Sequence, residues 1–205
     1  FPMLYHKEKE FDTHVEQWAQ YTNARIFAPG IGLYRLGSKD GNWDLSEISR
    51  QINFSRENGA QGQSFYRMRN LTDNLKDIKT VIAEEYQHPA KLPPLTWLSR
   101  EIPEAPTNIE VLKNQDNSIR IRWQPPLNEK NSKDLTYNIY VSNSEYFDVD
   151  NPDCAIATLL NRTEVYFKPK GYDEGLYYTV TASNRFHNES KIIESVFFIY
   201  SDLIK

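Results

Sequence analysis

The stretch Ala24–Trp43, ARIFAPGIGLYRLGSKDGNW, decides the expected fold of the first half of this chain. It begins as an apolar run, which predicts a strand over about Arg25–Leu36, and it breaks in the polar sequence Gly37–Asn42. A helical pattern over Leu45–Arg50 follows. Strand, polar loop and helix form the unit from which parallel sheets with crossover connections are built. The loop would follow the carboxyl end of the strand, where such folds keep their binding groups.

A similar unit precedes this stretch. Pro2–His6 predicts a short strand, and apolar residues at helical spacing predict an amphipathic helix over Asp12–Thr22. Asp12 or Thr13 would be its N-cap. The helix that begins at Leu45 is expected to end near Asn58-Gly59, a favourable C-cap pair.

A third unit follows. Gly62–Met68 predicts a strand, and the next helix would be capped by Thr72 or Asp73 and end near Tyr86. The order β-α-β-α-β-α over residues 1–88 predicts an α/β fold with a parallel sheet and right-handed crossovers. Gly30 and Gly32 are expected to allow close packing in the wall of this sheet.

The pattern changes after Pro103, where short alternating segments and turn clusters follow one another. Seven short strands in about 100 residues are typical of an antiparallel β-sandwich. Residues 89–103 are rich in proline and predict a stiff linker between residues 1–88 and the sandwich at residues 104–205. The expected strands are Thr107–Leu112, Ser118–Gln124, Leu135–Val141, Ile156–Leu160, Glu164–Lys168, Leu176–Ala182 and Ile192–Tyr200.

Composition excludes several classes of protein. An apolar fraction of 39% with a net charge of −4 is typical of an ordered globular chain and gives no basic footprint for nucleic acid. The longest apolar runs, such as Val196–Tyr200, are too short to span a membrane. Cys154 is the only cysteine, so no intrachain disulfide can form. Because the chain starts at Phe1 without an initiator Met or a signal-peptide pattern, we expect it to come from the interior of a longer gene product.

The second half resembles a fibronectin type III module, which belongs to the immunoglobulin-like sandwiches. Four spaced stretches carry the resemblance, and no Arg-Gly-Asp sequence stands in the chain. The resemblance implies that Tyr178 is the tyrosine-corner residue, with its hydroxyl bonded back to the backbone. The matching stretches are Ala105–Asn108, Trp123–Pro126, Tyr137–Val141 and Tyr178–Asn184.

The first half resembles the C-terminal end of bacterial glycosyl-hydrolase-like proteins related to family 10, which are (β/α)8 barrels that continue into a fibronectin-like module. This resemblance implies that residues 1–88 are the last three β/α units of such a partial (β/α)8 barrel. The matching stretches are Pro2–Tyr5, Ala28–Gly37 with its Gly-x-x-Leu-Tyr-Arg-Leu-Gly core, Trp43, Glu47-Ile48, Arg50–Ile52, Gly62-x-x-Phe65, Pro93-Pro94, Trp97-Leu98 and Ala105-Pro106.

The chain shows no convincing pair of catalytic carboxylates, although glycosidases generally place two across the scissile bond. Glu8 and Glu10 follow the first strand, and Asp40 and Asp44 lie near the second, but all four read as solvated loop charges. We therefore predict no catalytic residue in this chain. The four histidines have no metal-like spacing and no phosphate-binding loop is present, so no metal or cofactor is predicted.

A contribution to sugar binding is the sharper hypothesis, because aromatic and planar polar side chains fall near the ends of the expected strands. Strand alternation places Tyr34 and Arg35 on opposite faces, so that one of them would point to the mouth unless a bulge intervenes. The alternative is that Tyr34 and Tyr66 are core aromatics and that the arginines pair with local acids. The candidate substrate-binding residues are His6, Tyr34, Arg35, Trp43, Tyr66 and Arg67.

Two functions remain open. In the first, the chain is the C-terminal part of a polysaccharide-acting glycoside-hydrolase-like protein, inactive alone, that supplies part of the substrate mouth and an accessory sandwich. In the second, it is a non-catalytic module of the cell envelope that binds carbohydrate or protein or acts as a spacer. Both imply an extracellular, periplasmic or envelope location in a bacterium. Because parallel strands need neighbours on both edges, we expect the first-strand edge to be covered by self-association.

Overall fold

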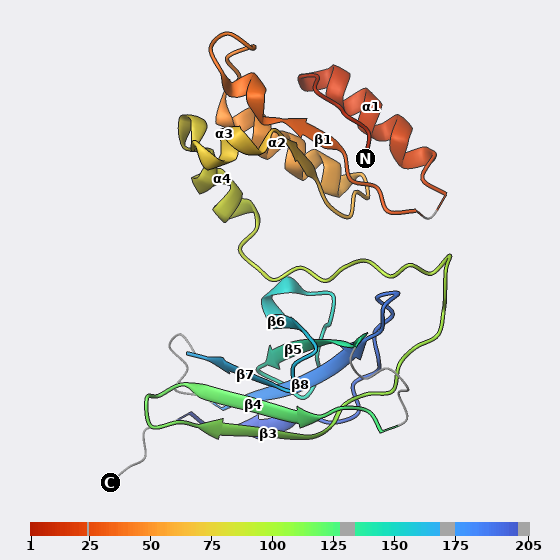
Figure 1. Ribbon diagram of the computed structural model, residues 1–205, viewed down its shortest axis with the longest axis vertical. Helices are drawn as coiled ribbons and strands as arrows, with labels where there is room; N and C mark the ends of the chain where they lie inside the picture. The colour runs from red at the N-terminus through yellow and green to blue at the C-terminus, as the bar shows by residue number, and fades with distance from the viewer. Residues whose placement is uncertain (24, 128–133, 169–174, 201–205) are drawn as a thin grey trace. The chain divides into compact units, whose positions relative to one another are not determined.

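A computed structural model of the chain describes residues 1–23, 25–127, 134–168 and 175–200. The chain divides into two compact units, Phe1–Gln87 and His88–Lys205. The first unit combines helices with a small parallel sheet, whereas the second is built from antiparallel sheets (Figure 1). Within the described residues, no helix is long and apolar enough to cross a membrane.

Three segments of the first unit run side by side in the same direction. β1 and β2 pair in parallel, with Gly30 opposite Ser64 and Gly32 opposite Tyr66. Met3 forms a parallel bridge to Gly30 on the other side of β1. The parallel arrangement expected from the element order is present, but a two-stranded sheet with one bridge does not establish a partial barrel. The elements are α1 (Glu8–Gln20), β1 (Gly30–Gly32), η1 (Leu33–Leu36), α2 (Leu45–Glu57), β2 (Ser64–Tyr66), α3 (Met68–Thr72), η2 (Leu75–Asp77) and α4 (Ile78–Glu85).

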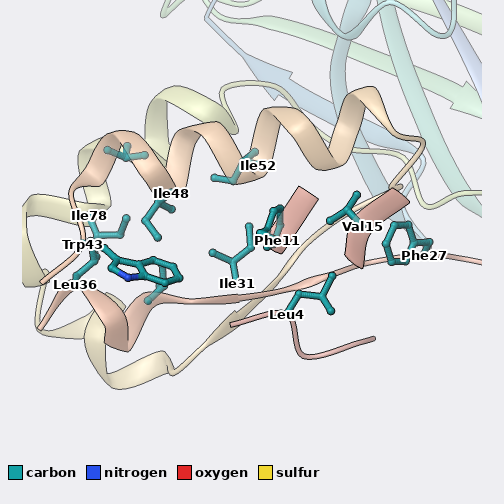
Figure 2. Close-up of a cluster of buried hydrophobic side chains, with 12 residues drawn as sticks. Leu4, Phe11, Val15, Phe27, Ile31, Leu36, Trp43, Ile48, Ile52 and Ile78 are labelled. Atoms are coloured by element: carbon teal, nitrogen blue, oxygen red, sulfur yellow. The ribbon is translucent and has the colours of Figure 1, made fainter. Parts of the chain in front are cut away.

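The core of the first unit lies between its helices and one face of these parallel segments. Ile48 and Ile52 project from α2 toward Ile31 of β1 (Figure 2). Because side chains alternate along a strand, the glycines on either side of Ile31 face the opposite way. The other buried members of this core are Leu4, Phe11, Val15, Phe27, Leu33, Leu36, Trp43, Ile78 and Val81.

Two boundaries in the first unit differ from the prediction. α1 begins at Glu8 rather than at Asp12, and the side chain of Asp12 pairs with Arg50 instead of capping a helix. The expected strand over Arg25–Leu36 shrinks to β1, because the chain enters the 3-10 turn η1 directly after Gly32.

The end of the first unit also departs from the prediction. The region expected to finish a strand at Met68 instead begins α3 there. Thr72 ends α3 and Asp73 is its C-cap, so neither residue caps the last helix, and that prediction was wrong. By contrast, α2 ends at Glu57 with Asn58 as its C-cap, close to the predicted pair.

The second unit is a two-sheet structure whose strands match the seven predicted segments. One sheet has the order β3-β4-β7 and the other the order β6-β5-β8-β9, and all pairs are antiparallel. Side chains from both sheets share one core, so the sheets pack face to face. The strands are β3 (Thr107–Lys113), β4 (Ile119–Gln124), β5 (Thr136–Ser142), β6 (Ala155–Leu160), β7 (Glu164–Phe167), β8 (Leu176–Ser183) and β9 (Val196–Phe198), with a short turn η4 (Pro152–Cys154) before β6.

The aromatic residues that carry the resemblance to fibronectin type III modules lie in this core. Trp123 and Tyr137 are buried, with ring centroids 5.3 Å apart, and Tyr178 of β8 is buried as well. The backbone just upstream of β8, to which the hydroxyl of a tyrosine-corner residue would bond, falls at residues 169–174 and outside the described residues.

The predicted proline-rich linker is held against the sandwich. Leu95 N donates to Phe186 O at 2.8 Å, and Asn188 Nδ2 donates to the backbone oxygens of Ser99 and Glu101, each at 3.0 Å. Lys91 Nζ lies 2.9 Å from Glu189 Oε2. Residues 88–103 thus have no helix or strand but belong to the second unit.

Candidate functional site

Three tyrosines gather at the carboxyl ends of the three parallel segments. Tyr5 follows the Met3 bridge, Tyr34 follows β1, and Tyr66 ends β2. The ring centroids of Tyr5 and Tyr66 are 5.4 Å apart in a stacked geometry. Tyr34 meets both rings edge-on, at 5.7 Å from Tyr5 and 5.8 Å from Tyr66. These stacked and edge-to-face arrangements are the ones that aromatic pairs prefer, and we call the three residues the tyrosine cluster.

The glycines of β1 make room for this cluster. A Cβ atom on Gly32 would lie 3.2 Å from Cε1 of Tyr34 and 3.3 Å from Cδ1 of Tyr5. A Cβ atom on Gly30 would lie 3.4 Å from Cε1 of Tyr5. The φ of Gly32 is −86°, so the lack of space, not the backbone conformation, favours glycine there. The close packing expected of these two glycines is therefore confirmed, and its partners are the tyrosines.

The three rings are exposed to different degrees. Tyr5 and Tyr34 are half-buried, whereas 49% of Tyr66 is exposed. Burial, with smaller contributions from Tyr66 and Tyr34, raises the pKa of Tyr5 above its ordinary value of 10.0. The Tyr5 hydroxyl is therefore neutral at physiological pH, and the cluster presents one accessible ring supported by two others.

Arg35 is tied to the loop that follows η1. Its guanidinium carbon lies 5.0 Å from the centroid of the Tyr34 ring, and its Nη1 donates to Asp40 O at 3.2 Å. Tyr34 and Arg35 are adjacent residues of a 3-10 turn, so the predicted alternation onto opposite faces was wrong. Arg35 thus connects the Tyr34 ring to the loop through this contact and this hydrogen bond.

The polar groups of the loop Gly37–Trp43 form hydrogen bonds mainly within the first unit. Trp43 N donates to Arg35 O at 2.9 Å, and Asn42 N donates to Gly37 O at 3.0 Å. Lys76 Nζ donates to Asn42 Oδ1 and to Trp43 O, each at 2.9 Å. The loop is thus a closed structural element, and Asp40 remains exposed on it.

The other three predicted site residues lie apart from this arrangement. Trp43 is only 7% exposed and sits in the core beside Leu36, Ile48 and Ile78 (Figure 2). His6 turns toward α1, with Nδ1 2.9 Å from Glu10 Oε1 and its ring stacked on His14. Arg67 follows Tyr66 directly and is exposed. The structure therefore groups Tyr34, Tyr66 and Arg35, and it buries Trp43.

Tyr5 belongs to the site although the sequence reasoning did not select it. The rule that selected Tyr34 and Tyr66 was an aromatic residue near the end of an expected strand. Tyr5 satisfies the same rule within Pro2–His6. Gly30 and Gly32 could have indicated Tyr5, because an aromatic ring can lie flat against a strand whose facing residues are glycines.

A buried carboxylate network lies near the tyrosine cluster in sequence but has a structural role. Glu47 is 6% exposed, and its Oε1 accepts from Glu8 N at 3.0 Å and from Gln51 Nε2 at 2.7 Å. Arg50 Nε donates to Glu47 Oε2 at 2.9 Å and Arg50 Nη1 to Asp12 Oδ1 at 2.7 Å. Burial alone would raise the pKa of Glu47, but the bonds from Arg50, Glu8 and Gln51 hold it below its ordinary value. All of its acceptor capacity serves the junction of α1 and α2.

The carboxylates that follow the strands are solvated. Glu8, Glu10, Asp40 and Asp44 are all exposed, and Glu8 pairs with Lys7 at 3.2 Å. Across the described part of the chain, no group of three or more His, Cys, Asp or Glu side chains is placed to hold a metal ion. The arrangement offers aromatic surface and cationic or amide hydrogen-bond donors, which suit binding better than acid–base chemistry.

Comparison with known proteins gives one distant relative by sequence. No protein-family model matches the chain. The glycosyl hydrolase YngK of Bacillus subtilis (strain 168) is 26% identical over 190 residues, which cover 88% of this chain and 36% of that relative. The chain thus spans little more than a third of the length of the relative it matches.

Solved structures overlap the chain over about half of its length. A Fn3-like protein from Clostridium thermocellum has 19% identity and a TM-score of 0.38, and covers 50% of this chain and 98% of its own. The central fibronectin-III array of RIM-binding protein has 15% identity and a TM-score of 0.37, and covers 49% of this chain and 36% of its own. The assignment of the second unit as a sandwich rests on the strand order and shared core described above.

Proposed function

We propose that this chain is the C-terminal part of a polysaccharide-acting, glycoside-hydrolase-like protein of the bacterial envelope or exterior. The first unit contributes one part of the substrate mouth, and the second is an accessory β-sandwich. The tyrosine cluster at the carboxyl ends of three parallel segments is the observation that carries this proposal. The distant similarity to a glycosyl hydrolase supports the same class of substrate.

The cluster has the chemistry of a sugar platform. A pyranose ring has an apolar face of C–H groups, which packs against an accessible aromatic ring, and an equatorial belt of hydroxyls. Tyr66 supplies such a ring, and Ser64 and Arg67 beside it are exposed and offer hydrogen-bond donors to the hydroxyl belt. Because Tyr5 and Tyr34 brace Tyr66, little conformational entropy is lost when a ligand stacks on it.

Hydrolysis is assigned to the rest of the parent protein. A glycosidase needs a general acid with a raised pKa and a second carboxylate on the other side of the scissile bond. The carboxylates at the strand ends of this chain are exposed, and the buried Glu47 has a pKa that is lowered. The proposal therefore places the catalytic pair on segments other than residues 1–87.

Affinity gel electrophoresis of the full chain in soluble xylan, hydroxyethyl cellulose and glycol chitin tests the proposal. Tyr66→Ala should raise the dissociation constant for a retarding polysaccharide about tenfold, which corresponds to the loss of one ring contact. Tyr21→Ala is the matched control, since Tyr21 is 73% exposed at the end of α1 and outside the cluster. Absence of retardation in every polysaccharide, or equal losses in both variants, would overturn the proposed mouth. Hydrolysis by this chain that depends on one of its carboxylates would overturn its assignment as inactive alone.

The alternative, a non-catalytic binding or spacer module, is favoured by one observation. The second unit has a cavity of its own, lined by residues 91–102 and by one face of the β6-β5-β8 sheet. Polysaccharide binding that survives Tyr66→Ala but is lost on substitution in that cavity would decide for this alternative.

A further inference from the structure

A cavity of about 420 Å³ lies in the second unit. One wall is the face of the β6-β5-β8 sheet that points away from the sandwich core, with the side chains of Thr136, Asn138, Thr158 and Ser183. A second part of the lining comes from residues 91–102 and is largely apolar. Its volume is within the range of about 300–1,000 Å³ that small-molecule sites occupy.

The lining of the cavity contains an ion pair between Lys91 and Glu189. Glu189 Oε1 accepts hydrogen bonds from Tyr140 Oη at 2.6 Å and from Asn138 Nδ2 at 3.0 Å. Its other oxygen, Oε2, accepts from Lys91 Nζ at 2.9 Å. Asp150, which is exposed, lies 3.6 Å from the same ammonium group. Glu189 is thus fully engaged, and the lining carries one more negative than positive charge.

Several polar groups of the sheet wall are available to a ligand. The hydroxyls of Thr136 and Thr158 make no hydrogen bond within the described part of the chain. Ser183 Oγ accepts from Asn138 Nδ2 at 3.1 Å and keeps its own O–H to donate. His187 Nδ1 lies 2.9 Å from Pro93 O, and because a carbonyl oxygen can only accept, the neutral ring keeps Nε2 as an acceptor.

We propose that this cavity binds an uncharged, polyhydroxylated ligand of the size of one or two sugar residues. Hydroxyls act as donor and acceptor at once, which matches the threonine hydroxyls on the sheet wall. The apolar face of such a ligand would contact Leu92, Pro94 and Ile102. The excess negative charge disfavours an anion. This site does not depend on the tyrosine cluster, so either can fail without the other.

Amide chemical-shift mapping on the 15N-labelled full chain tests the site. The probes are glucose, xylose and N-acetylglucosamine and their β-1,4-linked dimers, at up to about 50 mM, since a few hydrogen bonds support millimolar affinity. At least one probe should give saturable shifts at Asn138, Thr158 and Ser183. Glucuronic acid should bind more weakly than glucose. Equal or tighter binding of glucuronic acid would overturn the preference for an uncharged ligand.

Matched variants identify the groups that bind. Thr158→Val and Thr136→Val keep shape and β-propensity and each should weaken binding about fivefold. Thr163→Val removes an exposed threonine outside the cavity and should leave affinity unchanged. Binding that both cavity variants leave intact would overturn the site, as would the absence of shifts with every probe. Shifts confined to Tyr5, Tyr34 and Tyr66 would overturn it too, while supporting the substrate mouth of the first unit.

Discussion

Glu47 Oε1 on α2 accepts a hydrogen bond from Glu8 N at 3.0 Å, and this bond fixes where α1 begins. The first backbone N–H groups of a helix lack partners within it and are usually capped by a nearby side chain. Here the capping carboxylate comes from a residue 39 positions away. Arg50 Nη2 also donates to Glu8 O at 3.3 Å. One turn of α2 therefore bonds both the N–H and the C=O of the first residue of α1.

Glu47→Ala should therefore destabilise the first unit. The substitution leaves Glu8 N, one N–H of the Gln51 amide and part of the Arg50 guanidinium without their acceptor, while Gln51 Nε2 keeps its bond to His6 O. We expect a loss of about 2–4 kcal/mol in the free energy of unfolding. Urea denaturation followed by circular dichroism measures it. Glu57→Ala, at the exposed end of the same helix, should change stability by less than about 0.5 kcal/mol. Equal effects of the two substitutions would show that the network has no stabilising role.

The same carboxylate makes stability depend on pH. The pKa of Glu47 is held below its ordinary value of 4.5 in the folded state, so its contribution is complete above that pH. It is lost as the pH falls from 4.5 through the lower folded-state pKa, because the folded protein then has to take up a proton. The urea midpoint of the first unit should fall across this acidic range. Glu47→Gln should be less stable at neutral pH but show a shallower fall, and an unchanged slope would contradict the assignment.

The glycines of β1 allow a sharp comparison. Gly32→Ala places a methyl group against Tyr5 and Tyr34, so we expect a loss of about 1–3 kcal/mol and a changed near-ultraviolet circular dichroism of the tyrosines. Gly62→Ala is the control, because a Cβ there meets nothing within 4 Å. Its effect should stay within about 0.5 kcal/mol. If both variants behaved alike, the packing of Tyr5 against β1 would be unimportant.

Tyr140→Phe tests the ion-pair cluster of the second unit. The substitution removes a donor to the partly buried Glu189, and we expect a loss of about 1–2 kcal/mol in unfolding free energy. Tyr146→Phe, on a residue that is 79% exposed, should have no measurable effect. Thermal unfolding of both variants against the parent provides the measurement, and a neutral Tyr140→Phe would argue that water replaces the hydroxyl at no cost.

We expect the chain to self-associate through the unpaired edge of the Pro2–His6 segment. The Pro2–His6 segment bonds to β1 on one side, through Gly30 N to Pro2 O at 2.7 Å and Leu4 N to Gly30 O at 3.1 Å. Among the described residues no strand pairs with its other side, and Met3 is 73% exposed there. Light scattering should show a mass that rises with concentration. Met3→Lys should lower it, because an edge lysine opposes strand pairing. A constant monomeric mass at high concentration would refute the expectation.

Local patterns were sufficient to predict the order of the longer helices and of the sandwich strands. The helical pattern that begins at Leu45 predicted α2, and the alternating segment Ser118–Gln124 predicted a strand, which is β4 with Ile119, Ile121 and Trp123 buried. In both cases, the apolar residues that form the sequence pattern are also the ones that face the core. The parallel direction of the first three segments followed from the helices between them.

Distant contacts account for what local patterns missed. α1 starts early because Glu47, on another helix, caps it, and no local signal reports that. The Arg35 guanidinium lies over the Tyr34 ring because the strand gives way to a 3-10 turn, so strand alternation ends at Gly32. The position of Trp43 after a loop suggested a substrate-binding residue, but its side chain is buried in the core.

The bonds between residues 91–101 and the sandwich also bear on where the second unit can be truncated. Composition suggests cutting after Pro103, which would strip Asn188 of its acceptors at Ser99 and Glu101 and leave Glu189 without Lys91. A fragment that starts at His88 keeps both. The smallest fragment of the sandwich expected to fold alone therefore begins before its first strand. It includes residues 88–103, which the sequence suggests are only a linker.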